Sequence, residues 1–344
     1  MVDKKGISTV ACEEKHRGDS VAEIQTFVSP FTRVAVSAHT YPDGDAVGSC
    51  LAMANFLAAL GKEVSVILPK KDIGAVNVLD GFDSIVNPDE YDFSAEPDLF
   101  VCLDCSEPSR ICDERIRSWV GRVPTLNIDH HGKELFGNRN YVVNDASSTG
   151  ELVFEIAEAS GWKINPATAD ALWCALVTDT NRFTLPSVTA GTLRCAARLV
   201  ECGARTAFLS DAIYMNEQPN VFDLRTRAMR SLERWCNGLV AAIALDSDDF
   251  AATGCTKQDA EEFPNIPRSI AGAKLSFYFY PFPVDQPIGA RISVRSREDS
   301  PVTARMVAEH FGGAGHEHSA GAVYPGSVAA TIAAVREYLE TLMK

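Results

Sequence analysis

His39-Thr-Tyr-Pro-Asp43-Gly-Asp45-Ala-Val-Gly-Ser49 is the stretch from which the fold of this chain can be predicted. The apolar run 33–38 before it is typical of a buried strand, and the periodic apolar segment 46–60 after it indicates a helix. The histidine and both aspartates are therefore expected on a strand-to-helix loop, where open α/β sheets place their ligand sites. Two residues apart on an extended backbone, Asp43 and Asp45 could each face a different cation. The alternative interpretation is an Asp/Gly-rich turn followed by a helix N-cap.

Two more predicted strands end in the same kind of residue. The apolar run 99–103 is followed by Asp104, and the run 123–128 is followed by Asp129-His130-His131. Parallel strands place their carboxyl ends on one edge of a sheet, so these polar groups should meet there, which favours a site over a turn. The side chains expected to converge are His39, Asp43, Asp45, Asp104, Asp129, His130 and His131.

The alternation of strands and helices predicts an α/β fold with a doubly wound, mainly parallel sheet. A strand is also expected at 63–68, and helices are expected up to residue 160 and over 167–177. The first of these helices is capped by Ser148 or Thr149, and Glu151, three residues after Ser148, would give a capping box. Asp179 follows the second of these helices, where a lone carboxylate is usually an ordinary loop residue.

The second half of the chain predicts a smaller, mixed α/β domain. Helical patterns fill 187–234, and strands are expected at 239–245, 274–280 and 288–294, followed by helices after Pro301 and over 327–343. The predicted boundaries are an N-terminal extension over 1–30, the first domain over 31–205, a helical connector over 206–237 and the second domain over 238–344.

Composition narrows the class of protein. The 344 residues are 46% hydrophobic, enough for about two packed domains. A formal net charge of −14 argues against a protein that coats long duplex nucleic acid, which would need a basic surface. The ten cysteines lie mostly in apolar segments, as expected for reduced thiols of the cytoplasm. The N-terminus lacks an apolar signal segment and no run is long enough to cross a bilayer, so we expect a cytoplasmic protein without a membrane partner.

Five motifs in this order give a family resemblance: HTYPDGDAVGS, LDCSEPSRI, NIDHHG, NDASSTGELV and TDTNRF. Together they resemble the DHH phosphoesterase superfamily, and the later VRSRE and HFGGAGHEHSAGA resemble its DHH-associated C-terminal domain. The pairing is similar to the bacterial nano-RNase and pAp-phosphatase type. The resemblance covers residues 34–321.

The resemblance implies a binuclear metal site that usually holds manganese. It assigns His39 and Asp43 to one ion, Asp45 and His130 to the other, and Asp104 to a bridging position, and it adds Asp179 to the cluster. Carboxylate and imidazole ligands without a thiolate suit Mn²⁺. Asp129 and His131 would support the ligands or handle protons; the alternative for His131 is a packing or hydrogen-bonding role.

The second domain is implied to bind substrate. Arg295 could clamp a phosphate, although exposed arginines are common surface cations. The glycine cluster at residues 312–321 would let backbone N–H groups approach a ligand, although glycine-rich turns are also common. Ala314 interrupts the family's glycine run and Asn181 stands where glycine is frequent, so Ala314 would be strained at positive φ whereas Asn181 tolerates it. The expected substrate-binding residues are Arg295, Gly313, Gly315 and His316.

The implied function is hydrolysis of short oligoribonucleotides to 5′-mononucleotides, and of pAp to AMP, by a hydroxide that two metal ions activate. The implied partners are short single-stranded RNA or small nucleotides, and the resemblance allows a homodimer. One alternative is a phosphodiesterase for cyclic or linear dinucleotides of the c-di-AMP or pApA type. Another is a catalytically silent nucleotide-binding scaffold, which would be expected to lose metal ligands.

Overall fold

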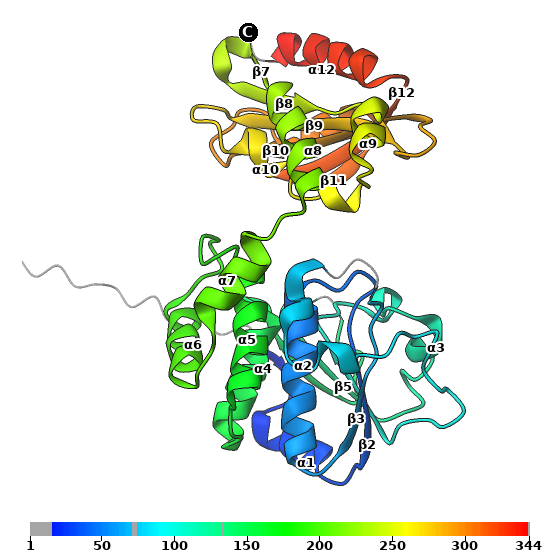
Figure 1. The fold of residues 1–344 in the computed structure, drawn as a ribbon, viewed down its shortest axis with the longest axis vertical. Coiled ribbons are helices and arrows are strands. Elements are labelled where there is room, and N and C mark those ends of the chain that lie inside the picture. The colour runs from blue at the N-terminus through cyan, green and yellow to red at the C-terminus, as the bar shows by residue number, and fades with distance from the viewer. Residues whose placement is uncertain (1–15, 71–73, 133, 343–344) are drawn as a thin grey trace, which may run out of the picture. The chain divides into compact units, whose positions relative to one another are not determined.

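The computed structural model describes residues 16–70, 74–132 and 134–342 and divides the chain into two units, with the division between Asn216 and Glu217. The division falls inside the stretch predicted as a connector. Helix α7 (Thr206–Tyr214) belongs to the first unit and helix α8 (Pro219–Arg230) to the second (Figure 1).

The sheet of the first unit has six strands in the order β1-β6-β5-β4-β2-β3. Strands β2 to β6 are parallel and β1 is an antiparallel edge strand, which confirms the predicted doubly wound, mainly parallel architecture. The strand order reverses between β2 and β4, and open α/β sheets bind ligands at such a switch point. The bounds are β1 (His16–Gly18), β2 (Arg33–Ser37), β3 (Glu63–Val66), β4 (Leu99–Leu103), β5 (Thr125–Asp129) and β6 (Arg139–Val143).

Helices α2, α4 and α5 cover one face of this sheet and enclose the main apolar core with it (Figure 1). Close approach between α2 and α5 requires Gly48, because a Cβ there would lie 2.3 Å from the carbonyl oxygen of Ala171. Short elements around Trp119 cover the other face. The helix bounds are α1 (Val21–Val28), α2 (Gly44–Ala59), α3 (Glu114–Arg117), α4 (Thr149–Ser160), α5 (Pro166–Asp179) and α6 (Ala190–Glu201).

The second unit is built on a mixed sheet in the order β11-β12-β10-β9-β8-β7, in which only β8 and β9 pair in parallel. Helices α11 and α12 pack on one face, and α8 lies over the β8 and β9 part of the other with α9 and α10. The bounds are β7 (Glu233–Trp235), β8 (Val240–Ala244), α9 (Ser247–Thr253), α10 (Asn265–Arg268), β9 (Leu275–Phe282), β10 (Gly289–Ser296), α11 (Ala304–His310), β11 (Ala314–His316), β12 (Ser319–Pro325) and α12 (Val328–Leu342).

The glycine cluster forms a β-hairpin of β11 and β12. Gly312 has φ 73° and Gly315 has φ 150°, whereas Ala314 lies outside the left-handed region, so the alanine is not strained there. Asn181 has φ 44°, as its side chain tolerates, but Arg182 and Phe183 are also left-handed at φ 60° each, which the sequence did not predict.

The described residues also bear on two expectations from composition. Nine cysteines are free within the described ranges, and six of them are buried. None of the helices in these ranges combines the length and the apolar composition that crossing a bilayer requires.

Candidate metal centre

Three loops at the switch point of the first sheet bring the predicted acidic and histidine side chains together. The loop after β2 carries His39, whose Nε2 lies 3.3 Å from Oδ2 of Asp104, the residue that follows β4. Asp43 completes this group as the N-cap of α2, where its carboxylate accepts the backbone N–H of Asp45 and Ala46. The ligand atoms of His39, Asp43 and Asp104 all lie within 4.8 Å of one another, close enough to share one cation.

A second group forms beside the first from Asp45, His130 and Asp179. Nε2 of His130 lies 3.4 Å from Oδ2 of Asp179, 3.8 Å from Oδ2 of Asp45 and 3.7 Å from Oδ1 of Asp104. Asp179 is the last residue of α5 rather than a loop residue, and its carboxylate reaches the cluster because α5 packs against α2. These atoms again lie within 4.8 Å of one another, so the groups form two adjacent candidate cation sites.

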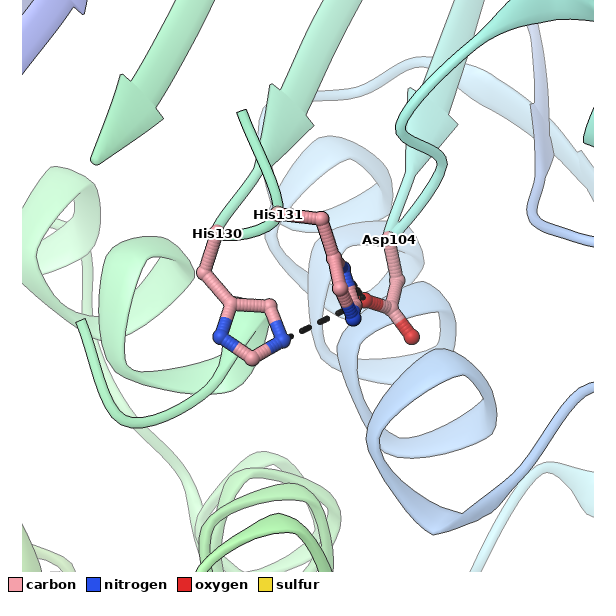
Figure 2. Close-up of side chains that lie close together, drawn as sticks. All are labelled: Asp104, His130 and His131. Atoms are coloured by element: carbon pink, nitrogen blue, oxygen red, sulfur yellow. Dashed lines mark ion pairs between the residues drawn. The ribbon is translucent and has the colours of Figure 1, made fainter. Parts of the chain in front are cut away.

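Asp104 lies between the two groups. Its Oδ2 faces His39, whereas its Oδ1 faces His130 and His131 (Figure 2). The backbone has φ 54°, a conformation that costs energy for a residue with a side chain and that is common where function requires it. Burial opposes the charged form, but hydrogen bonds with His131 and His39 outweigh it and lower the pKa of Asp104. A carboxylate that stays ionised, with its oxygens directed at two groups, suits a bridging ligand.

The hydrogen bond of His130 fixes which nitrogen faces the carboxylates. Its Nδ1 lies 3.2 Å from the carbonyl oxygen of Ala146, which can only accept, so Nδ1 carries the hydrogen. In the neutral ring, Nε2 is then a lone pair directed at carboxylate oxygens, and this buried atom has no hydrogen-bond partner. A lone pair among negative oxygens is unfavourable without a cation between them, and Nε2 is a usual metal-ligating atom.

Asp45 is held by the amino terminus of α4. Its two oxygens accept the backbone N–H of Thr149 at 2.7 Å and of Gly150 at 2.9 Å, and Ser49 Oγ donates at 3.0 Å. Burial nevertheless raises the pKa of Asp45, with contributions from the charges of Asp104 and Asp179. These donors fix the orientation of a carboxylate whose charge needs a counter-ion.

Repulsion among the carboxylates also acts on Asp179, whose side chain is partly exposed. Burial, together with the charges of Asp104 and Asp43, raises the pKa of Asp179 to about 6 despite the opposing charge of His130. Divalent cations would remove this repulsion. The donor set of carboxylate oxygens and imidazole nitrogens, with no thiolate, fits Mn²⁺ or Mg²⁺ better than a structural zinc.

Asp129 and His131 form a pair beside the two groups. Nδ1 of His131 lies 3.0 Å from Oδ1 of Asp129, whose Oδ2 accepts the backbone N–H of Gly132 at 3.1 Å. Hydrogen bonds with Asp104 and then Asp129 raise the pKa of His131 to about 10. The side chain of His131 is 45% exposed, so this imidazole can meet a bound molecule.

Two side chains of the site were not predicted. Thr149 Oγ1 donates to Oδ1 of Asp104 at 3.1 Å, and Ser49 Oγ donates to Asp45. Both belong to motifs of the sequence. Ser49 lies one helical turn after Asp45 on α2, whereas the Thr149 hydroxyl reaches Asp104 only because the tertiary structure brings the start of α4 to that carboxylate. Ser148 is the N-cap of α4, as predicted.

The four predicted substrate-binding residues lie in the second unit, on or next to its mixed sheet, and not among the candidate metal-ligating groups. Ser319 of β12 pairs with both Arg295 of β10 and His316 of β11, so these side chains share one face. Gly313 and Gly315 approach β12 closely: a Cβ at Gly313 would lie 2.2 Å from the carbonyl oxygen of Gly321.

Comparison with known proteins agrees with this architecture. The chain is 28% identical to the bifunctional oligoribonuclease and PAP phosphatase NrnA of Thermus thermophilus over 301 residues, which are 85% of this chain and 84% of that protein. It is 26% identical to the cyclic-di-AMP phosphodiesterase PdeA of Listeria monocytogenes over 85% of this chain but 45% of that protein. A solved structure, of an exopolyphosphatase-related protein from Bacteroides fragilis, shares the fold at a TM-score of 0.80 and 24% identity, over 94% of this chain and 97% of that one.

The family model for the DHH family, N-terminal domain, matches residues 33–176. That range begins with β2 and includes the loops after β2, β4 and β5, together with α4 and most of α5. Residues 33–176 of the first unit therefore match the DHH family, N-terminal domain.

Proposed function

We propose that this chain is a metal-dependent phosphoesterase that hydrolyses short oligoribonucleotides to 5′-mononucleotides and removes a phosphate from pAp. The observation that carries the proposal is the pair of three-residue groups joined by Asp104 at the switch point of the sheet. The relative from Thermus thermophilus, which is matched over most of both chains, supports the substrate class.

The ligand residues would hold two divalent ions, which we propose to be Mn²⁺. His39, Asp43 and Asp104 would hold one, and Asp45, His130 and Asp179 the other. Two such ions, when bound, activate a water nucleophile and offset charge on the transferring phosphoryl group. Asp104 would orient the centre, with Thr149 Oγ1 holding one of its oxygens in place.

His131 is proposed to donate a proton to the leaving oxygen. Its pKa, raised to about 10 by Asp104 and Asp129, keeps the ring protonated near neutral pH. Asp129 holds Nδ1, which leaves the hydrogen on Nε2 for transfer from a half-exposed ring. Asp129 thereby acts as a positioning residue for His131.

In the second unit, Arg295 and His316 are proposed to bind the substrate away from the reacting phosphate, with Gly313 and Gly315 allowing close approach of the backbone. The shared sheet face of Arg295 and His316 supports this role. Loss of either side chain should weaken turnover of a dinucleotide about tenfold to a hundredfold and leave a small generic diester nearly unaffected.

The second candidate function is hydrolysis of cyclic dinucleotides, favoured by the similarity to the phosphodiesterase from Listeria monocytogenes. That relative is about twice as long as the part matched here, whereas the oligoribonuclease relative is matched over 84% of its length. Length therefore favours the first function. A catalytically silent scaffold is disfavoured because each proposed ligand position carries a carboxylate or an imidazole.

A substrate panel tests the proposal. Purified chain with Mn²⁺ is assayed on di- to pentanucleotides, pAp, cyclic dinucleotides and pyrophosphate. We expect the short oligonucleotides and pAp to be hydrolysed, and Asp104→Asn to lower turnover by at least about a hundredfold, since several kcal/mol of charge stabilisation are lost. Asp98→Asn is the control, because Asp98 lies at the opposite end of β4 and pairs with Arg33. Preference for cyclic dinucleotides, or normal turnover by a folded Asp104→Asn protein, would contradict the proposal.

A further inference from the structure

Glu151 is a buried carboxylate of the first unit that the proposed chemistry does not use. It lies in the first turn of α4 and is 5% exposed. Within the described ranges it forms no ion pair and belongs to neither candidate cation group. Removing a charge from water costs free energy unless hydrogen bonds compensate it, so the partners of this carboxylate indicate its role.

One oxygen of Glu151 accepts three hydrogen bonds from two segments of the chain. Its Oε2 accepts the backbone N–H of Ser147 at 3.0 Å, the Ser147 hydroxyl, and the Thr192 hydroxyl at 3.1 Å. Ser147 precedes α4, whereas Thr192 lies in the first turn of α6, and both residues are fully buried. Hydrogen bonds to an ionised acceptor are stronger than neutral ones, so this oxygen ties the segment before α4 to both helices.

This use of the carboxylate differs from ordinary helix capping. A glutamate three residues after the N-cap commonly reaches back to the N–H of the cap residue itself. Here Ser148 Oγ accepts the Glu151 N–H at 3.0 Å, but the Glu151 side chain reaches one residue further back, to Ser147. The hydrogen bonds therefore fix the chain on the far side of the cap as well as the cap.

Ser147 lies between two groups that orient the candidate metal ligands. On one side of it, the carbonyl oxygen of Ala146 lies 3.2 Å from Nδ1 of His130 and holds the hydrogen on that nitrogen. On the other side, the backbone N–H of Thr149 donates to Asp45 at 2.7 Å. A displacement of this short segment would therefore disturb an imidazole and a carboxylate of the centre together.

We propose that Glu151 is a positioning residue for the metal centre, an inference that rests on the proposed function. It holds the segment 146–149 so that the Ala146 carbonyl keeps Nε2 of His130 directed at the carboxylates and the start of α4 keeps Asp45 oriented. The donors to Glu151 are one N–H and two hydroxyls, which an amide oxygen can also accept. Glu151→Gln should therefore retain the role, whereas Glu151→Ala should lose it.

The first measurement is the affinity of the metal-free chain for Mn²⁺, by calorimetric titration. Glu151→Ala should weaken it about tenfold to a hundredfold, the usual effect of removing a group that supports metal ligands, and Glu151→Gln should restore most of it. Asp170→Ala is the matched control, because Asp170 is a similarly buried carboxylate of the same unit whose oxygens accept Arg205 instead. This control should lower the melting temperature without weakening Mn²⁺ binding.

The second measurement is the tautomer of His130, by nitrogen-15 NMR of the metal-free chain at a pH where the ring is neutral. The His130→Gln spectrum identifies the signal. In the intact chain and in Glu151→Gln, the hydrogen should lie on Nδ1, where the Ala146 carbonyl accepts it. In Glu151→Ala, a larger share of the rings should carry it on Nε2, because the carbonyl is no longer held in place.

Unchanged Mn²⁺ affinity in Glu151→Ala, or an equal loss in Asp170→Ala, would overturn the proposal, as would an unchanged His130 tautomer in Glu151→Ala. If Glu151→Ala does not fold, Ser147→Ala removes one of the three donors and decides instead: weaker Mn²⁺ binding supports the proposal, and unchanged binding overturns it. If the intact chain binds no Mn²⁺, the proposed function fails, and the tautomer alone then decides about Glu151.

Discussion

Asp129 holds His131 through a 3.0 Å contact between Oδ1 and Nδ1, and the pair lies beside two candidate cation sites. Because Asp129 is buried and its other oxygen accepts the Gly132 N–H, the carboxylate is fixed on both sides. The ring of His131 is thus oriented by a residue that is itself immobilised, which makes the pair suited to directional proton transfer.

The first prediction concerns this pair. Asp129→Asn should lower kcat about tenfold to a hundredfold, the usual effect of removing a supporting hydrogen bond. A proton donor loses activity as pH rises through its pKa, and removing the Asp129 charge lowers the pKa of His131, so the alkaline fall should move to lower pH. Rate measurements across pH check this. In a His131→Gln background the same change should have no further effect, and an additive loss would contradict a role through His131.

The second prediction concerns Thr149, whose hydroxyl donates to Oδ1 of Asp104. Thr149→Val keeps the shape and the backbone N–H but removes this bond, so Mn²⁺ affinity should fall about tenfold to a hundredfold. Thr149→Ser retains the hydroxyl and serves as the matched control. Calorimetric titration of the metal measures both variants, and equal affinity in the valine and serine proteins would show that the hydroxyl does not support Asp104.

A third prediction concerns the contact between α2 and α5. Gly48→Ala would place a methyl group 2.3 Å from the Ala171 carbonyl oxygen, so the helices must move apart. We expect a loss of about 1–3 kcal/mol in the free energy of unfolding, typical of overpacking. Because α2 carries Asp45 and α5 carries Asp179, metal affinity should fall as well. Ala58→Ser on the exposed end of α2 is the control, and unchanged denaturation and metal binding in Gly48→Ala would refute the argument.

The fourth prediction concerns metal removal and pH. The pKa of Asp179 is raised to about 6 in the folded chain, above about 3.9 for an unperturbed aspartate. Its stabilising contribution is therefore fully present below the unfolded value and is lost as pH rises through about 6. The melting temperature of the chelated protein should accordingly rise when the pH is lowered from 7 to 5. The same rise should be smaller in the chelated Asp179→Asn protein.

Cation binding should reverse this dependence of the melting temperature on pH. Mn²⁺ offsets the ionised carboxylates, so it should raise the melting temperature more at pH 7 than at pH 5. Thermal melts of the chelated and loaded proteins at both pH values measure the effect. An equal rise at both values would show that deprotonation of the cluster is not linked to cation binding.

Much of the first unit could be predicted from local sequence. The apolar runs that became β2, β4 and β5 are short and bounded by polar residues, and parallel pairing then requires Asp104 and His130 to meet the loop after β2. The predicted ligands therefore follow from periodicity and one topological rule. The predicted N-cap Ser148 likewise needs only residues three apart, since its Oγ accepts the backbone N–H of Glu151. The reciprocal half of the predicted capping box is not formed, because the Glu151 carboxylate accepts the backbone N–H of Ser147 instead.

Other features depended on contacts between segments far apart in the chain. Asp179 joins the cluster because α5 packs on α2 at Gly48, and the tautomer of His130 follows from the Ala146 carbonyl. The guanidinium of Arg291 lies over Gly321 only in the register that pairs Ser293 with that glycine. Sequence alone indicated which residues form β2, β4 and β5 and which side chains follow them, since these depend on neighbours along the chain. The tertiary structure decided which of these elements touch, since that depends on how side chains from distant segments pack together.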